Sequence, residues 1–344
     1  MPRKDFVDAL RAVAEKRGLK FQALSHDWII QISDPSTKRV CSIFGYTFDV
    51  NSAGAVEICK EKAATSLVLA SHGIANIPHS VFLSPGNEFT APYVKEKGNW
   101  ADMRALIEKL GLPVVLKPLK GTGGFNVVKA KCWREVEGAV QHLFSAEYGL
   151  AICPYKEIVD EYRCIYLDGK VEFVYRKVRS HVVGDGTSTL AALVASAMCR
   201  GSGADAKAAA QAASELEPEK LASVPASGQE VPLQWKHNLG LGASLDVTVP
   251  PEKKSAVEEI AIGAARAVGV RFCSADVVEV KGEGLMIMEI NGGVMMDSLI
   301  GQLGDAGKAL AERVYESAVL LALGLSLEAG GDGRGKRLRE GDPL

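Results

Sequence analysis

Residues 114–130, VVLKPLKGTGGFNVVKA, predict two short strands joined by a glycine-rich loop. Most glycine-rich phosphate loops lead into a helix, whereas here the chain returns as a strand, so we expect a hairpin. Gly121, Gly123 and Gly124 free the backbone, which lets N–H groups close over phosphate oxygens. Lys117 ends the first strand and can reach a phosphate as a point charge. An ordinary hairpin turn explains the same glycines nearly as well.

Length, net charge and the numbers of cysteine and histidine residues restrict the class of protein. The chain has 344 residues, enough for two or three domains, and a net charge of −2 gives no basic surplus for nucleic acid. No apolar stretch is long enough to span a membrane, and the N-terminus predicts an amphipathic helix rather than a signal peptide. The seven cysteines are scattered without a CxxC pair, and the six histidines lack metal-ligand spacing. We therefore expect a cytoplasmic protein with reduced thiols and no zinc site.

Hydrophobic periodicity divides the chain into blocks of mixed helix and strand. Residues 1–100 predict an α/β domain, residues 101–155 a small compact block, and residues 156–328 a larger third block. Within the third block, residues 200–231 are rich in Ala, Ser and Gly, which predicts a mobile excursion with one short helix. Residues 329–344 predict a disordered tail. Helices are expected at 5–17, 54–72, 101–110, 132–145, 253–268 and 307–323, and strands at 28–33, 39–44, 79–83 and 149–153.

The segment EYRCIYLDGKVEFVYRK predicts a hairpin, because Asp-Gly is the signal for a two-residue type I′ turn. A turn at this position places Glu161 opposite Arg176, with Arg163 on the same face. A polar triplet backed by an apolar face is a candidate site wall, and a solvated face with a cross-strand ion pair is the alternative. The residues expected on the apolar face are Tyr162, Cys164, Tyr166, Val171, Phe173 and Tyr175.

Two further strands, FCSADVVEV and LMIMEI, flank the tetrapeptide KGEG. If KGEG is a four-residue hairpin loop, Val280 pairs with Leu285. Asp276 then lies directly opposite Glu289, and Asn291 points the same way. Facing carboxylates repel each other, whereas Mg²⁺ prefers carboxylate and amide oxygens. The set predicts a magnesium site, and two carboxylates at a wet sheet edge are the alternative.

Taken in this order, these segments resemble the ATP-grasp superfamily over roughly residues 54–323. The matching stretches are VVLKPLKGTGGFNVV, EYRCIY, KHNLGLGAS, SADVVEV and MEINGG. The chain looks most similar to ligases of the cyanophycin-synthetase, glutathione-synthetase-like and ribosomal-S6-modification type, and RKVRSHVVGDGTSTLAALV is particularly like cyanophycin synthetase. The resemblance implies an α/β (α+β) ATP-grasp fold, in which an N-terminal α/β domain precedes two α+β subdomains that clasp ATP. Residues 101–155 would be the small lid and residues 156–328 the catalytic subdomain.

The same resemblance assigns residues to the nucleotide by motif position. Lys62, in an Asp-Lys pair that is here Glu61-Lys62, would contact phosphate together with Lys117 and the glycine flap, and Glu161 would contact the ribose. The family often has a Glu at the adenine hinge, where this chain has AICPY, so backbone groups would have to read the adenine. The nucleotide-binding residues are then Lys62, Lys117, Lys120, Gly121, Gly123, Gly124, Cys153, Tyr155 and Glu161.

The resemblance also implies a metal site for Mg²⁺ or Mn²⁺, with two ions, and residues at the reacting phosphate. The family motif Asn-x-x-Pro-Gly, which contacts the carboxylate substrate or the nucleophile, is replaced by NGGVMMDS, so the substrate cannot be read by analogy. The residues concerned are Asp276, Glu289 and Asn291 for the metal, Arg163, Arg176 and Asn238 for the γ-phosphate and acyl phosphate, and Gly292, Gly293, Met295 and Ser298 for the substrate.

The implied activity is ATP-dependent carboxylate–amine ligation through an acyl phosphate, with release of ADP and phosphate. The expected partners are small amino acids or peptides and a second copy of the chain, with no nucleic acid and no membrane. Three alternatives remain: a carboxylate–thiol ligase, a phosphotransferase, and a regulator that binds a nucleotide without turnover. The intact set of lysine and metal-ligand residues argues against the regulator. Residues 200–231 would either close over the second substrate or serve as a passive linker.

Overall fold

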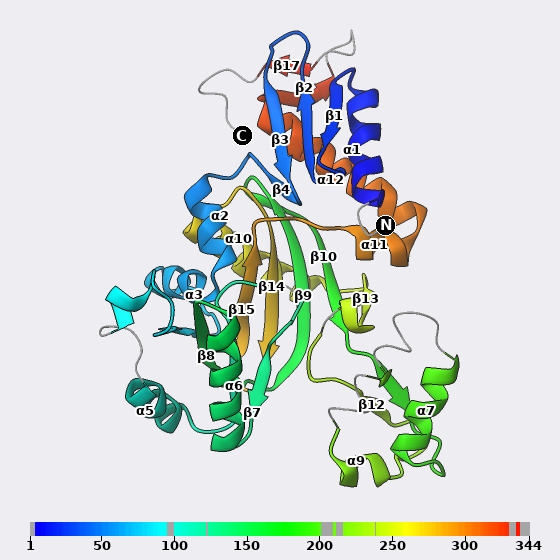
Figure 1. Ribbon diagram of the computed structural model, residues 1–344. Coiled ribbons are helices and arrows are strands. Elements are labelled where there is room, and N and C mark those ends of the chain that lie inside the picture. Colours follow the sequence, from blue (N-terminus) through cyan, green and yellow to red (C-terminus); the bar gives the residue numbers. More distant parts are fainter. Residues whose placement is uncertain are drawn as a thin grey trace.

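The computed structural model describes residues 4–94, 100–121, 123–200, 209–210, 216–237, 239–329 and 335–337. Its strands form a four-stranded N-terminal sheet, a central five-stranded sheet, a four-stranded lid sheet and two small ribbons. The N-terminal sheet lies at one end of the central sheet, and the lid and a separate arm lie on either side of its other end (Figure 1). Every paired strand in the described sheets is antiparallel to its neighbour.

The N-terminal sheet alternates buried and exposed residues, as expected of a sheet that is covered on one face. Its buried side chains, such as Ile30 and Ile43, pack with helices α1 (Lys4–Lys16) and α12 (Asp305–Leu323). Helix α12 comes from the far end of the sequence, so the two ends of the chain share one core. The strands are β1 (Lys20–Leu24), β2 (Ile29–Ser33), β3 (Val40–Phe44) and β4 (Thr47–Phe48).

The central sheet has the strand order β13-β10-β9-β14-β15. One face is covered by α2 (Ala53–Lys60), α3 (Lys62–Ser71) and α10 (Pro251–Val268). At one end of the other face, apolar residues such as Ile165 and Phe272 join the core of the N-terminal sheet. The strands are β9 (Ile158–Leu167), β10 (Lys170–Val178), β13 (Ser244–Asp246), β14 (Phe272–Val280) and β15 (Gly284–Asn291).

Helices α2 and α3 replace the single helix that the sequence predicts over 54–72. The helix breaks at Glu61, whose backbone is extended and whose carboxylate accepts a hydrogen bond from the Ala64 N–H at 3.2 Å. Glu61 is therefore the N-cap of α3. The break places Lys62 at the first position of α3, beside the end of the lid sheet, where its N–H donates to the Leu119 carbonyl oxygen at 3.2 Å.

The lid sheet has the order β5-β8-β6-β7, and helices α5 (Trp100–Leu110) and α6 (Trp133–Ala146) pack on one face. Strand β7 pairs antiparallel with β6, which confirms the predicted hairpin around the glycine loop. Strand β5, from the predicted N-terminal block, pairs with β8 and belongs to this sheet. The strands are β5 (Ser80–Leu83), β6 (Val114–Pro118), β7 (Val128–Ala130) and β8 (Gly149–Pro154).

The arm carries a small hydrophobic cluster of its own, which includes Val182, Leu190 and Leu233. Most of the predicted excursion belongs to this arm, and α9 is a short helix within it; residues 201–208 and 211–215 lie outside the described residues. The elements are β11 (His181–Val183), α7 (Leu190–Arg200), α9 (Pro218–Ala222) and β12 (Glu230–Pro232).

At the C-terminal end, β16 (Leu325–Ala329) pairs with β17 (Gly335–Arg337). Of the predicted disordered tail, residues 329 and 335–337 are in these strands, and the other residues after 329 lie outside the described part of the chain. Short elements complete the fold: α11 (Asp297–Leu303) and the 3₁₀ turns η1 (Ala91–Tyr93) and η2 (Leu239–Leu241).

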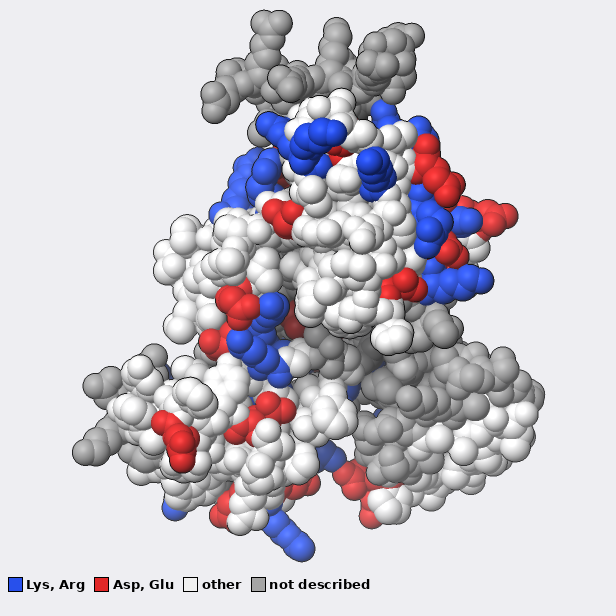
Figure 2. All heavy atoms as spheres, turned by 45° about the horizontal axis from the view of Figure 1, so that its top comes forward, with Lys and Arg blue, Asp and Glu red and all other residues white. Residues whose placement is uncertain are grey.

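Positive and negative side chains are interspersed over the face of the molecule that Figure 2 shows. Lysine and arginine gather over the N-terminal sheet, with aspartate and glutamate beside them. Within the described part of the chain, none of the helices has the length and apolarity needed to cross a membrane.

The register of the β9–β10 hairpin differs from the prediction. Lys170 pairs with Leu167, as the two-residue turn predicts, but a β-bulge at Glu172 shifts every later pair by one residue. Glu161 therefore pairs with Lys177, and Arg176 pairs with Tyr162. Because successive residues of a strand point to opposite faces, Arg176 and Lys177 exchange faces relative to the prediction.

The β14–β15 hairpin contains two departures that cancel. Val280 pairs with Gly284 rather than Leu285, so the loop is one residue shorter than predicted. A second bulge, between Asp276 and Val277, then restores the predicted pairing of Asp276 with Glu289. The prediction that these carboxylates face each other is confirmed.

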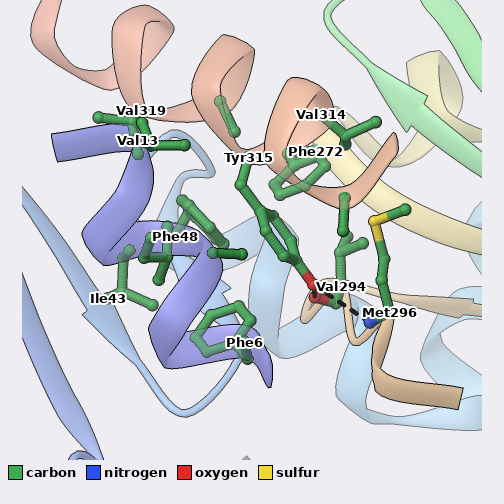
Figure 3. Close-up of a cluster of buried hydrophobic side chains, with 14 of the residues drawn as sticks. Phe6, Val13, Ile43, Phe48, Phe272, Val294, Met296, Val314, Tyr315 and Val319 are labelled. Carbon is green, nitrogen blue, oxygen red and sulfur yellow. Dashed lines mark hydrogen bonds between the residues drawn. The ribbon is translucent and has the colours of Figure 1, made fainter. Parts of the chain in front are cut away.

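The largest core joins the segment after β15 to helix α12 (Figure 3). Tyr315 is fully buried, and its ring packs edge-on against Phe6 at a centroid distance of 5.0 Å. Its hydroxyl donates to the Val294 carbonyl oxygen at 3.2 Å and accepts from the Met296 N–H at 3.1 Å. One buried side chain therefore holds the backbone of the segment that follows the predicted metal ligands.

Replacing Tyr315 with Phe should lower the free energy of unfolding by about 1–3 kcal/mol, because a buried N–H and a buried carbonyl lose their partner while the ring packing remains. Urea denaturation of the wild type and the variant measures the change. An unchanged midpoint and slope would show that the two hydrogen bonds do not stabilise the fold.

Candidate active site

The floor of the candidate site is a buried group of charges on the central sheet. Strands β9, β10 and β14 place Glu161, Arg163, Lys177 and Asp276 on one face. The Arg163 guanidinium donates from Nε to Asp276 Oδ1 at 2.8 Å and from a terminal nitrogen to Oδ2 at 2.7 Å. The Lys177 ammonium lies 2.9 Å from Asp276 Oδ1 and also donates to Glu161. Two cations and two carboxylates thus form a closed network, in which each anion has a partner.

The protonation states in this network follow from burial and pairing. Burial acts to raise the pKa of Asp276, but Arg163 and Lys177 outweigh it and hold the pKa below its usual value. Burial acts to lower the pKa of Lys177, yet Asp276 and Glu161 hold that pKa above its usual value. For Glu161, burial wins and raises the pKa despite the adjacent Lys177. His237 lies beside Glu161, with Nδ1 3.6 Å from a carboxylate oxygen, and burial lowers its pKa to about 3, so it is neutral near pH 7.

A second group of charges lies where the lid meets β15. The Lys62 ammonium donates to the Gly121 carbonyl oxygen at 2.7 Å and lies 3.6 Å from Glu289. Burial lowers the pKa of Lys62, and the charge of Lys117 adds to this shift while Glu289 opposes it. Lys117 is itself buried on β6. Two lysines and one carboxylate leave a local excess of positive charge, which favours an anion here.

The glycine flap has the backbone that its sequence predicts. Gly121, Gly123 and Gly124 have φ values of +144°, +71° and +69°, which residues with a Cβ rarely adopt. Thr122 lies outside the described residues. The Lys120 ammonium lies 2.9 Å from Glu57 on α2, so this predicted phosphate ligand is paired with a carboxylate.

The predicted metal ligands lie on two paired strands, with Asp276 in the middle of β14 and Glu289 and Asn291 near the end of β15. Glu289 is opposite Asp276, and Asn291, two residues further along, pairs with Ser274. Glu289 and Asn291 offer oxygen donors of the kind Mg²⁺ prefers, and the Lys62 ammonium lies 3.6 Å from Glu289. The Asp276 carboxylate already contacts Arg163 and Lys177, so it fits a metal site only if its oxygens bind the ion as well as these two cations. Over the described ranges, no three His, Cys, Asp or Glu side chains are grouped closely enough to bind a metal.

A cavity of about 320 Å³ lies beside the segment that links β8 to β9. It is lined by residues 155–159 together with Arg179, Trp235 and Lys281. Tyr155 meets Trp235 edge-on, with ring centroids 6.0 Å apart. The Tyr155 N–H donates to the Pro113 carbonyl oxygen at 3.3 Å, so it is already used in the lid sheet and is not available to adenine. Trp235 is not among the residues predicted from the sequence, although it lies two positions before His237 in the KHNLGLGAS region that carries the resemblance.

The structure separates Arg176 from the other predicted catalytic residues. Its guanidinium pairs with Asp160 at 3.3 Å and Asp246 at 2.8 Å, on the face opposite Glu161. The prediction that Arg176 shares a face with Glu161 is wrong because of the bulge at Glu172. Lys177 lies on the Glu161 face instead. In the sequence, the only sign that Lys177 could take this place is that two cations, Arg176 and Lys177, are adjacent.

Among the remaining predicted residues, Asn238 lies outside the described residues. Gly293 forms a β-bridge with Thr47, where an added Cβ would lie 3.3 Å from the threonine hydroxyl oxygen. Met295 is exposed, and Ser298 lies in α11. The predicted substrate segment therefore runs along the N-terminal sheet, which the sequence analysis did not connect with the site.

Comparison with known proteins shows what the chain is similar to. The chain is 28% identical over 190 residues to cyanophycin synthetase from Trichormus variabilis, which covers 54% of the chain and 19% of that protein. It is 26% identical over 288 residues to the glutathione biosynthesis bifunctional protein GshAB from Mannheimia succiniciproducens, which covers 76% of the chain and 36% of that protein. The solved structure of a bifunctional glutathione synthetase from Pasteurella multocida superposes with a TM-score of 0.52 at 18% identity, over 90% of the chain and 44% of that structure.

The resemblance to the ATP-grasp superfamily is confirmed. The predicted fold is confirmed, although no family model matches the sequence. The chain spans about a fifth to a third of the length of the curated relatives described above. The roles of single residues stay predictions.

Replacing Lys177 with Met should lower the free energy of unfolding by about 3–5 kcal/mol, because Glu161 and Asp276 lose a buried partner. Arg176→Met is the matched control, one residue away on the other face, and an exposed pair of this kind contributes about 1 kcal/mol or less. Urea denaturation measures both. Equal losses in the two variants would contradict the network described for this site.

Replacing Gly123 with Val should raise the apparent KM for ATP with little change in the melting temperature of the protein without nucleotide. The backbone is disfavoured for a β-branched residue, while nothing lies within 4 Å of the added Cβ, so the flap can move without disturbing the core. Gly228→Val is the control, since Gly228 has φ +79° in a turn of the arm. A large stability loss with normal ATP kinetics would make the glycine loop a structural turn.

Proposed function

We propose that this protein is an ATP-dependent ligase that joins a carboxylate to an amine on amino acid or peptide substrates. The reaction proceeds through an acyl phosphate and releases ADP and phosphate. The observation that carries the proposal is the pair of Lys62 and Lys117. Lys62 is half-buried and contacts Glu289 and the Gly121 carbonyl oxygen of the flap, and Lys117 is buried on β6. Relatives named cyanophycin synthetase and GshAB support ligation.

The chemical problem is the convergence of negative charge. A carboxylate is a poor electrophile, and its attack on the γ-phosphorus of ATP brings a carboxylate against three phosphates. Lys62 and Lys117 supply positive charge at the phosphates, and the flap covers them. Magnesium or manganese ions, two by analogy with the superfamily, would add charge neutralisation when held by Glu289, Asn291 and Asp276.

Arg163 is the cation that we assign to the acyl phosphate. Its side chain is 20% exposed while it stays fixed on Asp276, so it has both an anchored position and an accessible edge. Lys177 takes the buried position that the sequence analysis gave to Arg176, and it keeps Glu161 and Asp276 in place. Both assignments concern the face of the sheet that the lid and the arm flank.

The nucleotide base is assigned to the cavity between Tyr155 and Trp235. Glu161, the predicted ribose ligand, follows shortly after residues 155–159 on β9. We also propose a cytoplasmic homodimer; the seven cysteines are all free, which is typical of a reducing compartment.

The test is product analysis with trapping of the activated acyl group. Amino acids and peptides are screened as carboxylate substrates with ATP, Mg²⁺ and hydroxylamine in place of the amine. A hydroxamate and stoichiometric ADP are expected, because a small nucleophile can attack an acyl phosphate. AMP as the stoichiometric product would overturn the acyl-phosphate mechanism, and dependence on coenzyme A rather than an amine would indicate a thioester-forming ligase.

Glu289→Gln should keep the fold and lower kcat by about a hundredfold or more, since loss of one charged metal ligand removes about 3 kcal/mol of transition-state stabilisation. Glu259→Gln, on an exposed position of α10, is the matched control and should turn over like the wild type. Activity of the Glu289 variant within a factor of two of the control would rule out its role at the metal.

A further inference from the structure

The cavity of about 320 Å³ that is assigned to the base continues the charged face of the central sheet. On that face Glu161 of β9 pairs with Lys177 of β10. Residues two positions apart in a strand share a face, so Val159 and Arg179 are the next residues along it. Both of them line the cavity. The cavity therefore lies in line with the network, where β10 leads into the arm (Figure 1).

One cation that lines this cavity has no carboxylate partner. Lys156 and Lys281 also line it, and their ammonium groups lie 2.7 Å from Glu283 and 3.0 Å from Glu157. Among the residues that the structure describes, no carboxylate lies within 4.0 Å of the half-buried Arg179 guanidinium. A guanidinium presents five N–H donors and no acceptor. Arg179 is therefore a hydrogen-bond donor that the described protein groups leave for a ligand.

The guanidinium of Arg179 also acts on the buried network. Burial lowers the pKa of His237, and the charges of Arg179 and Lys177 add to this shift. A charge has this effect when it lies near the ring rather than far out in solvent. His237 is itself beside Glu161, the predicted ribose ligand. The direction of the pKa shift thus agrees with the place that the strand register gives to Arg179.

The backbone groups that were expected to read the adenine belong to the lid sheet. Cys153 lies inside β8, where it pairs with Val115 of β6. The Tyr155 N–H donates to the Pro113 carbonyl oxygen at 3.3 Å. The ring nitrogens of adenine that carry no substituent are acceptors, so a base in this cavity needs a donor from elsewhere.

We propose that Arg179 reads the nucleobase, because its guanidinium donates a hydrogen bond to a ring nitrogen of the adenine bound in this cavity. Tyr155 and Trp235 supply aromatic surface, which holds any base, whereas the arginine supplies a directional contact. Arg179 is then a specificity-determining residue for the nucleotide. The inference rests on the proposed function, since it takes the cavity as the place of the base.

The test measures binding by calorimetry without the carboxylate and amine substrates. Adenosine is compared with 1-deaza-, 3-deaza- and 7-deazaadenosine, in each of which one ring nitrogen is replaced by C–H. The wild type should bind one of the three analogues about tenfold more weakly than adenosine. Arg179→Met should bind adenosine about tenfold more weakly than the wild type does, and it should not distinguish adenosine from that analogue.

Two further measurements serve as controls. Arg266→Met removes an exposed arginine of α10, on the other side of the central sheet, and should bind all four nucleosides like the wild type. Magnesium tripolyphosphate, which has phosphates but no base, should bind equally to Arg179→Met and to the wild type.

Three outcomes would overturn the inference. In the first, the wild type binds all four nucleosides equally, a result that depends on no variant. In the second, Arg179→Met keeps the preference of the wild type among the nucleosides. In the third, Arg179→Met binds tripolyphosphate more weakly than the wild type, which would make Arg179 a phosphate ligand. A wild type that binds neither MgATP nor adenosine would instead overturn the proposed function itself.

Discussion

The buried contact of Asp276 with Arg163 and Lys177 is the interaction on which the rest of the site depends. It joins the three middle strands of the central sheet through charges rather than through apolar packing. Removing buried charges from water is costly, and the geometry compensates only if every charge keeps its partner. The network therefore fixes the register and the facing of β9, β10 and β14, where the reacting end of a nucleotide is proposed to lie.

The molecule uses its buried charges in two different ways. The network on the central sheet is balanced, so it holds itself together without a ligand. The group around Lys62 and Lys117 is unbalanced. Among the residues that the structure describes, Glu289 is the only carboxylate within 4.0 Å of the Lys62 ammonium, and the flap contributes a carbonyl oxygen. An excess of cations is unfavourable in an empty site and favourable once an anion binds. The balanced network around Asp276 is therefore suited to stabilising the fold, and the unbalanced group around Lys62 and Lys117 is suited to binding an anion.

Apolar cores keep these charges in place. Tyr315 holds the segment after β15 through two backbone hydrogen bonds, and Phe6 and Phe48 pack against its ring (Figure 3). This core contains residues of both α1 and α12, which lie near opposite ends of the sequence. The end of β15, which carries Glu289 and Asn291, is thus supported by parts of the chain that lie about 300 residues apart in the sequence.

The sequence by itself determined the glycine hairpin, the order of the strands that carry Lys117, Asp276 and Glu289, and the oxygen donors at one sheet end. These follow from residue type and local turn chemistry, because glycine, Asp-Gly turns and alternating apolar residues act over a few positions. The tertiary structure alone decided which cation faces Glu161. At the bulge, the carboxylate of Glu172 lies 2.7 Å from the Arg313 guanidinium on α12, a contact across 141 positions. The bulge also places Lys177, rather than Arg176, in the site. The side-chain period of a strand is two, so a shift of one residue reverses the face of every later side chain, and no local pattern reveals it.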